Sequence, residues 1–73
     1  MQREEFRLRE SDEYIKLGQL LKATALVSSG VEAKLEIQDG NVMVNGEVCT
    51  MRGKKIHPGD IVIFQDREIE VIS

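Results

Sequence analysis

The sequence predicts an α+β fold in which two short helices accompany a small sheet, and three observations indicate it. Apolar residues recur at helical spacing from Leu17 onward. Ser29 opens a capping-box pattern, which marks the start of a second helix. The pair Asn45-Gly46 lies between apolar runs and is a hairpin signal. With 73 residues the chain has room for one domain, predicted over residues 1–73.

The N-terminal part predicts a strand followed by a helix. In residues 5–9, Phe6 and Leu8 alternate with arginines, which is the period of a half-buried strand. From residue 14 the spacing becomes helical, and good helix formers, apart from Gly18, continue to Thr24. We therefore expect a first strand over residues 5–9 and a first helix over residues 14–24.

The second helix is predicted to begin after Ser29 and to end at Asp39-Gly40. In a capping box the Ser29 hydroxyl accepts a hydrogen bond from the N–H of residue 32, while the Glu32 carboxylate accepts one from the N–H of residue 29. Gly40 can take the left-handed conformation that closes a helix. Local signals thus define both ends.

The faces of this second helix differ in chemistry. Gly30, Ala33 and Ile37 share a face that we expect to point inward. Lys34 and Gln38 share a neighbouring face because they are four residues apart. An amine and an amide on one exposed side make this helix a candidate for ligand binding.

A hairpin is predicted at Asn45-Gly46, because a type I′ turn needs positive φ at both central residues. A two-residue turn places Val44 opposite Glu47, Met43 opposite Val48 and Val42 opposite Cys49. Cys49 is then expected to be a small apolar group in the core. A basic loop follows, closed by a turn at Pro58-Gly59-Asp60, and two more strands are predicted on either side of Asp66-Arg67.

The formal charge of −3 is unevenly distributed along the chain. Residues 1–14 carry three arginines against five acids, and residues 61–73 carry one arginine against three, so each end has a net charge of −2. Residues 15–60 carry six Lys or Arg against five acids, net +1, and residues 48–59 contain no acid at all. Positive charge is therefore a local property of the middle of the chain.

Composition excludes several kinds of site. One cysteine allows neither an internal disulfide nor a multi-cysteine metal site. No apolar run reaches the roughly 20 residues that span a bilayer, and the N-terminus lacks the apolar region of a signal peptide. We expect a cytoplasmic protein with no membrane contact, no cofactor and no metal, and the oligomeric state stays open.

The stretch "KLGQLLKATALVSSGVEAKLEIQDGNVMVNGEVCTMRGKKIHPGDIV", residues 16–62, resembles the S-four (S4) RNA-binding domain, which is named for the fourth protein of the small ribosomal subunit. Its most specific parts are "EAK..I..G.V.VNG" and, after a basic loop, "K..PGD". The resemblance implies a helical pair packed on a small twisted antiparallel sheet, the αL motif. It also implies binding of structured RNA, with ribosomal RNA or a ribosomal particle expected for short members, and a role in ribosome assembly. No catalytic domain and no small-molecule substrate are expected.

The family pattern assigns candidate RNA-binding residues on the first helix, the second helix and the basic loop. They are Lys16, Lys22, Lys34, Gln38, Arg52, Lys54 and Lys55. The chain departs from the pattern at Gly18, Gly30 and Met51, where family members often carry an aspartate or arginines, so weaker electrostatic binding is expected.

Base stacking is not expected, because Phe6, Tyr14 and Phe64 fall in predicted core or strand positions. Arg7 and Arg9 are interpreted as structural partners of Glu68 or Glu70 rather than ligand contacts.

Three alternatives compete with this prediction. A protein-interaction module of the same fold with weak or no RNA binding agrees with the acidic net charge. An enzyme is disfavoured because His57, the single histidine, lies beside Pro58 in a predicted turn with no nucleophile nearby. A β-grasp carrier would need a terminal Gly-Gly, whereas this sequence ends "EVIS".

Overall fold

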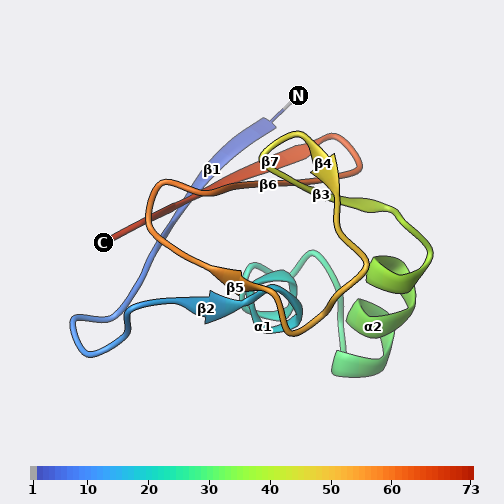
Figure 1. Ribbon diagram of the computed structural model, residues 1–73, viewed down its shortest axis with the longest axis horizontal. Helices are drawn as coiled ribbons and strands as arrows, with labels where there is room; N and C mark the ends of the chain where they lie inside the picture. The colour runs from blue at the N-terminus through green and yellow to red at the C-terminus, as the bar shows by residue number, and fades with distance from the viewer. Residues whose placement is uncertain (1) are drawn as a thin grey trace.

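The computed structural model describes residues 2–73 and has a sheet on one side and two helices on the other (Figure 1). Within these residues the elements are β1 (Gln2–Arg7), β2 (Ile15–Lys16), α1 (Leu17–Ala23), α2 (Gly30–Gln38), β3 (Val42–Val44), β4 (Glu47–Val48), β5 (Lys55–Ile56), β6 (Ile61–Phe64) and β7 (Arg67–Ile72). None of the helices in this range has the length and apolar character needed to cross a membrane.

The main sheet has five strands in the order β1-β7-β6-β3-β4. The pairs β7-β6, β6-β3 and β3-β4 are antiparallel, as the resemblance implied, but β1 runs parallel to β7. The sheet is therefore mixed. A parallel pair needs a long crossover connection, and here the helices and the intervening strands supply it (Figure 1).

The parallel register corrects the predicted partners of the N-terminal strand. The strand covers Gln2–Arg7 rather than residues 5–9, and it aligns Arg3, not Arg7 or Arg9, with Glu68. Arg3 pairs with Glu68 at 3.4 Å and with Glu70 at 2.8 Å, whereas Arg7 donates a hydrogen bond to the carbonyl of Ser73 at 2.8 Å.

The first helix begins at Leu17, three residues later than predicted. Ile15 and Lys16 form β2, which pairs antiparallel with β5 in a separate two-stranded ribbon. The first N–H groups of a helix have no partner within it. Here loop carbonyls accept from them, since Leu17 donates to Lys54 at 2.9 Å and Gly18 donates to Arg52 at 3.0 Å.

The second helix has the predicted bounds and cap. Ser29 is the N-cap, and its Oγ accepts from the N–H of Glu32 at 3.1 Å. The Glu32 carboxylate accepts from the N–H and hydroxyl of Ser28, not from the N–H of Ser29. Gly40 has φ of +80°, as a helix-closing residue should. Gly30, however, is exposed rather than packed inward.

The hairpin also follows the prediction. Asn45 and Gly46 have φ of 53° and 85°, and Val44 pairs with Glu47 and Met43 with Val48. Cys49 lies beyond β4, where its N–H donates to Val42 and its half-buried side chain packs against the core.

One core joins the sheet to the helices. Its members come from both helices, from β3, β5, β6 and β7 and from two connecting segments; they are Leu8, Leu17, Leu20, Leu21, Val27, Ala33, Ile37, Val42, Val44, Ile56, Val62, Phe64, Ile69 and Val71. Because apolar side chains from the α1 face and the α2 face are buried together, the outer faces of both helices are fixed relative to each other.

Candidate nucleic-acid interface

A shallow hollow of about 450 Å³ lies between α1, α2 and the loop that precedes β5. Four of its lining residues are cations, and none is an acid. We call this surface the basic hollow and define it by Lys16, Gly18, Gln19, Lys22, Gly30, Ala33, Lys34, Arg52 and Gly53. All four cationic side chains are exposed.

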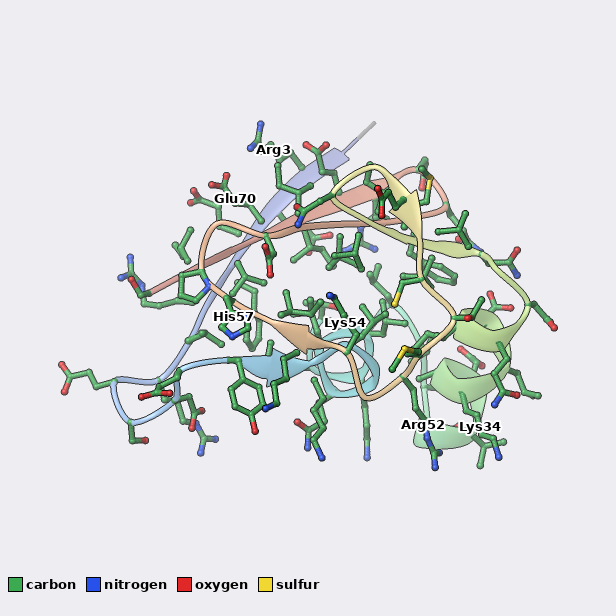
Figure 2. The ribbon with its side chains drawn as sticks, viewed as in Figure 1. Arg3, Lys34, Arg52, Lys54, His57 and Glu70 are labelled. Atoms are coloured by element: carbon green, nitrogen blue, oxygen red, sulfur yellow. The ribbon has the colours of Figure 1, made fainter. Side chains whose placement is uncertain are left out.

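Backbone contacts between segments distant in sequence build this surface. Gly18 donates to the carbonyl of Arg52, which anchors the loop on the start of α1. Lys34 follows the buried Ala33 on α2, so packing of Ala33 in the core turns Lys34 outward. In Figure 2 the side chains of Arg52 and Lys34 point the same way, off the end of the molecule farthest from the main sheet.

No acid lines the basic hollow, and the two acids within α2 are bonded to residues beside that helix. On α2, Glu32 accepts from Ser28, and Glu36 accepts from the amide of Asn41 at 3.4 Å. The ion pairs of residues 2–73 lie along β1 and β7 and in the turn after β5, and the cations of the basic hollow take part in none of them. Unpaired like charges on one surface attract a polyanion.

The structure brings together four of the seven predicted site residues, Lys16, Lys22, Lys34 and Arg52. Lys54 lines another hollow, which it shares with Glu47, and in Figure 2 it points back over the middle of the molecule. Lys55 places its Nζ 5.1 Å from the centre of the Tyr14 ring. Gln38 is exposed at the end of α2 and lines none of these hollows.

Sequence reasoning missed Gln19 as a lining residue and placed Tyr14 wrongly. Gln19 lies three residues from both Lys16 and Lys22, so its helical spacing was a usable signal. Tyr14 was expected in the core or a strand, but it precedes β2 and is exposed. The strand β2, which follows Tyr14, has two residues and is too short to show an alternating pattern in the sequence.

Asp60 connects the two turns beside the hairpin. Its carboxylate accepts from the amide of Asn45 at 3.0 Å and from the N–H of His57 at 2.8 Å, while the Asn45 carbonyl accepts from Ile61 at 2.9 Å. Asn45 therefore belongs to the turn, as predicted. Partial burial raises the pKa of Asp60, but the hydrogen bonds from His57 and Asn45 and the charges of His57 and Lys54 outweigh burial and lower it.

A family model of the S4 domain matches residues 6–72, nearly the whole described chain. The chain belongs to the S4 domain family. The match is wider than residues 16–62, on which the resemblance was based, and it contains every cation of the basic hollow.

Short proteins of known sequence resemble this S4 domain along most of their length. A Bacillus subtilis (strain 168) protein named "Probable ribosome maturation protein RlbA" is 42% identical over 50 residues, which cover 68% of this chain and 70% of RlbA. The Escherichia coli (strain K12) protein named "Putative RNA-binding protein YbcJ" is 35% identical over 60 residues, 82% of this chain and 86% of YbcJ.

A solved structure shares the fold. The solution structure of YbcJ from E. coli, described as revealing an αL motif involved in RNA binding, matches this S4 domain with a TM-score of 0.72 at 33% identity. The match covers 94% of this chain and 86% of YbcJ. The predicted fold class, two helices with a sheet in an αL arrangement, is thereby confirmed.

Proposed function

We propose that this S4-domain protein binds folded RNA through the basic hollow, that ribosomal RNA or a ribosomal particle is its target, and that it acts without catalysing a reaction. The observation that carries the proposal is the set of four unpaired cations around an acid-free surface built from three separate segments. The names of the relatives YbcJ and RlbA, which refer to RNA binding and to ribosome maturation, support this proposal.

Phosphate contacts account for the expected affinity. A phosphate backbone releases condensed counterions when cations neutralise it, so each contact strengthens binding and makes it sensitive to salt. Such contacts position the protein on RNA rather than read its sequence. Because the core fixes α1 and α2 and backbone hydrogen bonds fix the loop on α1, the spacing of the four cations favours RNA whose phosphates are already placed by folding.

A protein-interaction module is the second candidate, and one observation favours it. Four large apolar side chains, from α2, β4 and the loop that follows, are more than half exposed: Val31, Leu35, Val48 and Met51. Apolar contacts depend weakly on salt, whereas phosphate contacts depend on it strongly. Binding measured over a salt series therefore separates the two functions.

Binding of ribosomal RNA fragments by single variants tests the proposal. We expect Arg52→Ala and Lys34→Ala each to weaken binding and to reduce the salt slope by about one unit, as loss of one phosphate contact does. Lys54→Ala is the matched control, since it removes the same charge from a neighbouring loop position that faces elsewhere. Equal effects of Arg52→Ala and Lys54→Ala would contradict the assignment of the basic hollow.

The RNA target is a separate question that needs the intact cell. Ultraviolet crosslinking of the protein to RNA in cells, followed by sequencing of the attached RNA, should recover ribosomal RNA from defined positions. Recovery of unrelated RNAs in proportion to their abundance would contradict a ribosomal target and leave RNA binding intact.

A further inference from the structure

Tyr14 is an exposed aromatic ring beside Lys55 and His57, and packing in the core does not explain its position. It is 36% exposed, although aromatic side chains of small domains are usually needed in the core. Lys55 lies over the ring with its Nζ 5.1 Å from the centroid, and the His57 ring centre lies 5.9 Å away at an angle of 49°. Lys55 and His57 are two residues apart in an extended segment, so both side chains leave the same face of that segment and reach Tyr14.

Tyr14 also lines a second hollow. This hollow, of about 760 Å³, lies between the end of β1, the loop leading to β2, and α1. Tyr14 lines it together with Lys16 and Gln19, and both of these residues also line the basic hollow. The two hollows are therefore adjacent and share a wall.

Lys16 and Lys55 connect the basic hollow to Tyr14. They stand directly opposite each other in the β2-β5 pair, with Ile15 opposite Ile56 on the buried side. Directly opposed residues have Cβ atoms about 5 Å apart, and like charges there are destabilising. Neither lysine has an acidic partner among residues 2–73. A phosphate between them would offset this repulsion.

The chemistry of the hollow beside Tyr14 favours a base over a phosphate. Its walls carry Arg7, Arg9 and Gln19, but also Asp12 and Glu13. Carboxylates repel a phosphate, whereas they accept hydrogen bonds from the amino groups of bases. An aromatic ring beside a cationic path is the usual arrangement for holding an unpaired base.

We propose that Tyr14 is a stacking site for one unpaired base of an RNA whose backbone passes from the basic hollow between Lys16 and Lys55. The proposal rests on the proposed function, because it requires RNA in the basic hollow. The stacking site narrows the class of RNA that is bound to folded RNA with at least one unpaired nucleotide next to the helical part, and it excludes a blunt duplex.

Intrinsic fluorescence tests stacking directly, since Tyr14 is the only tyrosine and the chain has no tryptophan. The unmodified protein is titrated with two RNAs, a blunt hairpin and the same hairpin with a three-nucleotide single-stranded end. With absorption by the RNA corrected for, the second RNA should quench the tyrosine emission and the blunt one should not. Binding of both RNAs without selective quenching overturns the stacking site.

Variants of Tyr14 give a second readout. Tyr14→Leu should weaken binding of the RNA with the single-stranded end by about 5- to 150-fold, which is the range for loss of one stacked base. Its affinity for the blunt hairpin and its salt slope should not change, and Tyr14→Phe should keep the preference for the unpaired end. If circular dichroism shows that Tyr14→Leu does not fold, the quenching measurement and the Tyr14→Phe variant test the stacking site instead.

The possible failures are distinguishable. Salt-dependent binding of both RNAs with equal affinity, unaffected by Tyr14→Leu, would overturn the stacking site and leave the proposed function standing. Absence of binding to either RNA, or binding that salt does not change, would overturn both.

Discussion

Arg52 shows how a single side chain acquires its direction from a distant part of the chain. Its carbonyl accepts from Gly18, and the next bond of the same kind joins Lys54 to Leu17. These contacts fix the loop against α1, so Arg52 and Lys54 leave it in different directions (Figure 2). Consecutive cations in a sequence therefore need not form one patch. Lys54 and Lys55 are separated for another reason, because adjacent residues of an extended segment point to opposite sides.

Gly30 is a position at which an added cation should strengthen RNA binding. It lies in the wall of the basic hollow, and a Cβ added there would have no atom within 4 Å. We expect Gly30→Arg to fold normally, to tighten RNA binding and to raise the salt slope by about one unit. Gln65→Arg, which adds the same charge in the turn between β6 and β7, is the control. Equal gains from both variants would mean that net charge, not the hollow, sets the affinity.

Asp60 gives a prediction for stability at low pH. Its lowered pKa means that the folded state favours the carboxylate, so this contribution is complete above the unfolded pKa of about 3.9 and is lost as pH falls through the folded pKa. Asp60→Ala should cost about 1.5–3 kcal/mol at neutral pH, the range for hydrogen bonds to a charged group.

Urea unfolding of the two proteins from pH 7 down to pH 2.5 measures this effect. The difference in free energy of unfolding between wild type and Asp60→Ala should shrink below about pH 4. A difference that stays constant across this pH range would show that the hydrogen bonds of Asp60 do not depend on its charge.

At the scale of elements, α2 and the hairpin were predictable, whereas β1 and the β2-β5 pair were not. The cap at Ser29, the closing Gly40 and the turn at Asn45-Gly46 act within a few residues, so their sequence signals are local. The strand β2 has two residues, and its partner β5 lies about forty residues later, so neither has a periodic pattern. Formation of β2 shortened the predicted first helix and left Tyr14 exposed.

The residues of the candidate site likewise fall into a group that local sequence predicts and a group that it does not. Lys16, Lys22 and Lys34 lie on or beside helices whose faces could be deduced from spacing, and the structure places them together. The directions of Arg52, Lys54 and Lys55 depend on loop contacts with α1 and on pairing with β2. Such long-range contacts leave no trace in local sequence, so the basic loop was predicted as one patch and is divided in the structure.

The hairpin supplies the element-scale prediction. Gly46 has φ of +85°, where a β-branched side chain is strained. Gly46→Val should lower the free energy of unfolding by at least about 1–2 kcal/mol, as thermal unfolding by circular dichroism would measure. Gly46→Asn, which tolerates this conformation, should cost much less. Equal losses would show that side-chain bulk, not backbone conformation, limits this position.

For the whole molecule, the arrangement of charge matters more than its sum. A chain with net charge −3 presents an acid-free basic surface because none of its acids lines the basic hollow. Arg3 and Arg67 pair with acids across β1 and β7, and Glu32 and Glu36 bond to residues at the ends of α2. Among residues 2–73, the ion pairs of arginine with glutamate lie between β1 and β7, whereas the cations of the basic hollow take part in no ion pair.

The salt dependence of RNA binding tests whether the cations of the basic hollow bind phosphates. The slope of log Kd against log salt would be measured for wild type and for the variant Lys16→Ala, Lys22→Ala, Lys34→Ala, Arg52→Ala on the same ribosomal RNA fragment. A charge-preserving variant, with arginine at the three lysines and lysine at Arg52, is the control. We predict a slope reduced by up to about four units in the alanine variant only, with unchanged circular dichroism. An alanine variant that folds and keeps the wild-type slope would contradict the central claim that these four cations bind RNA phosphates.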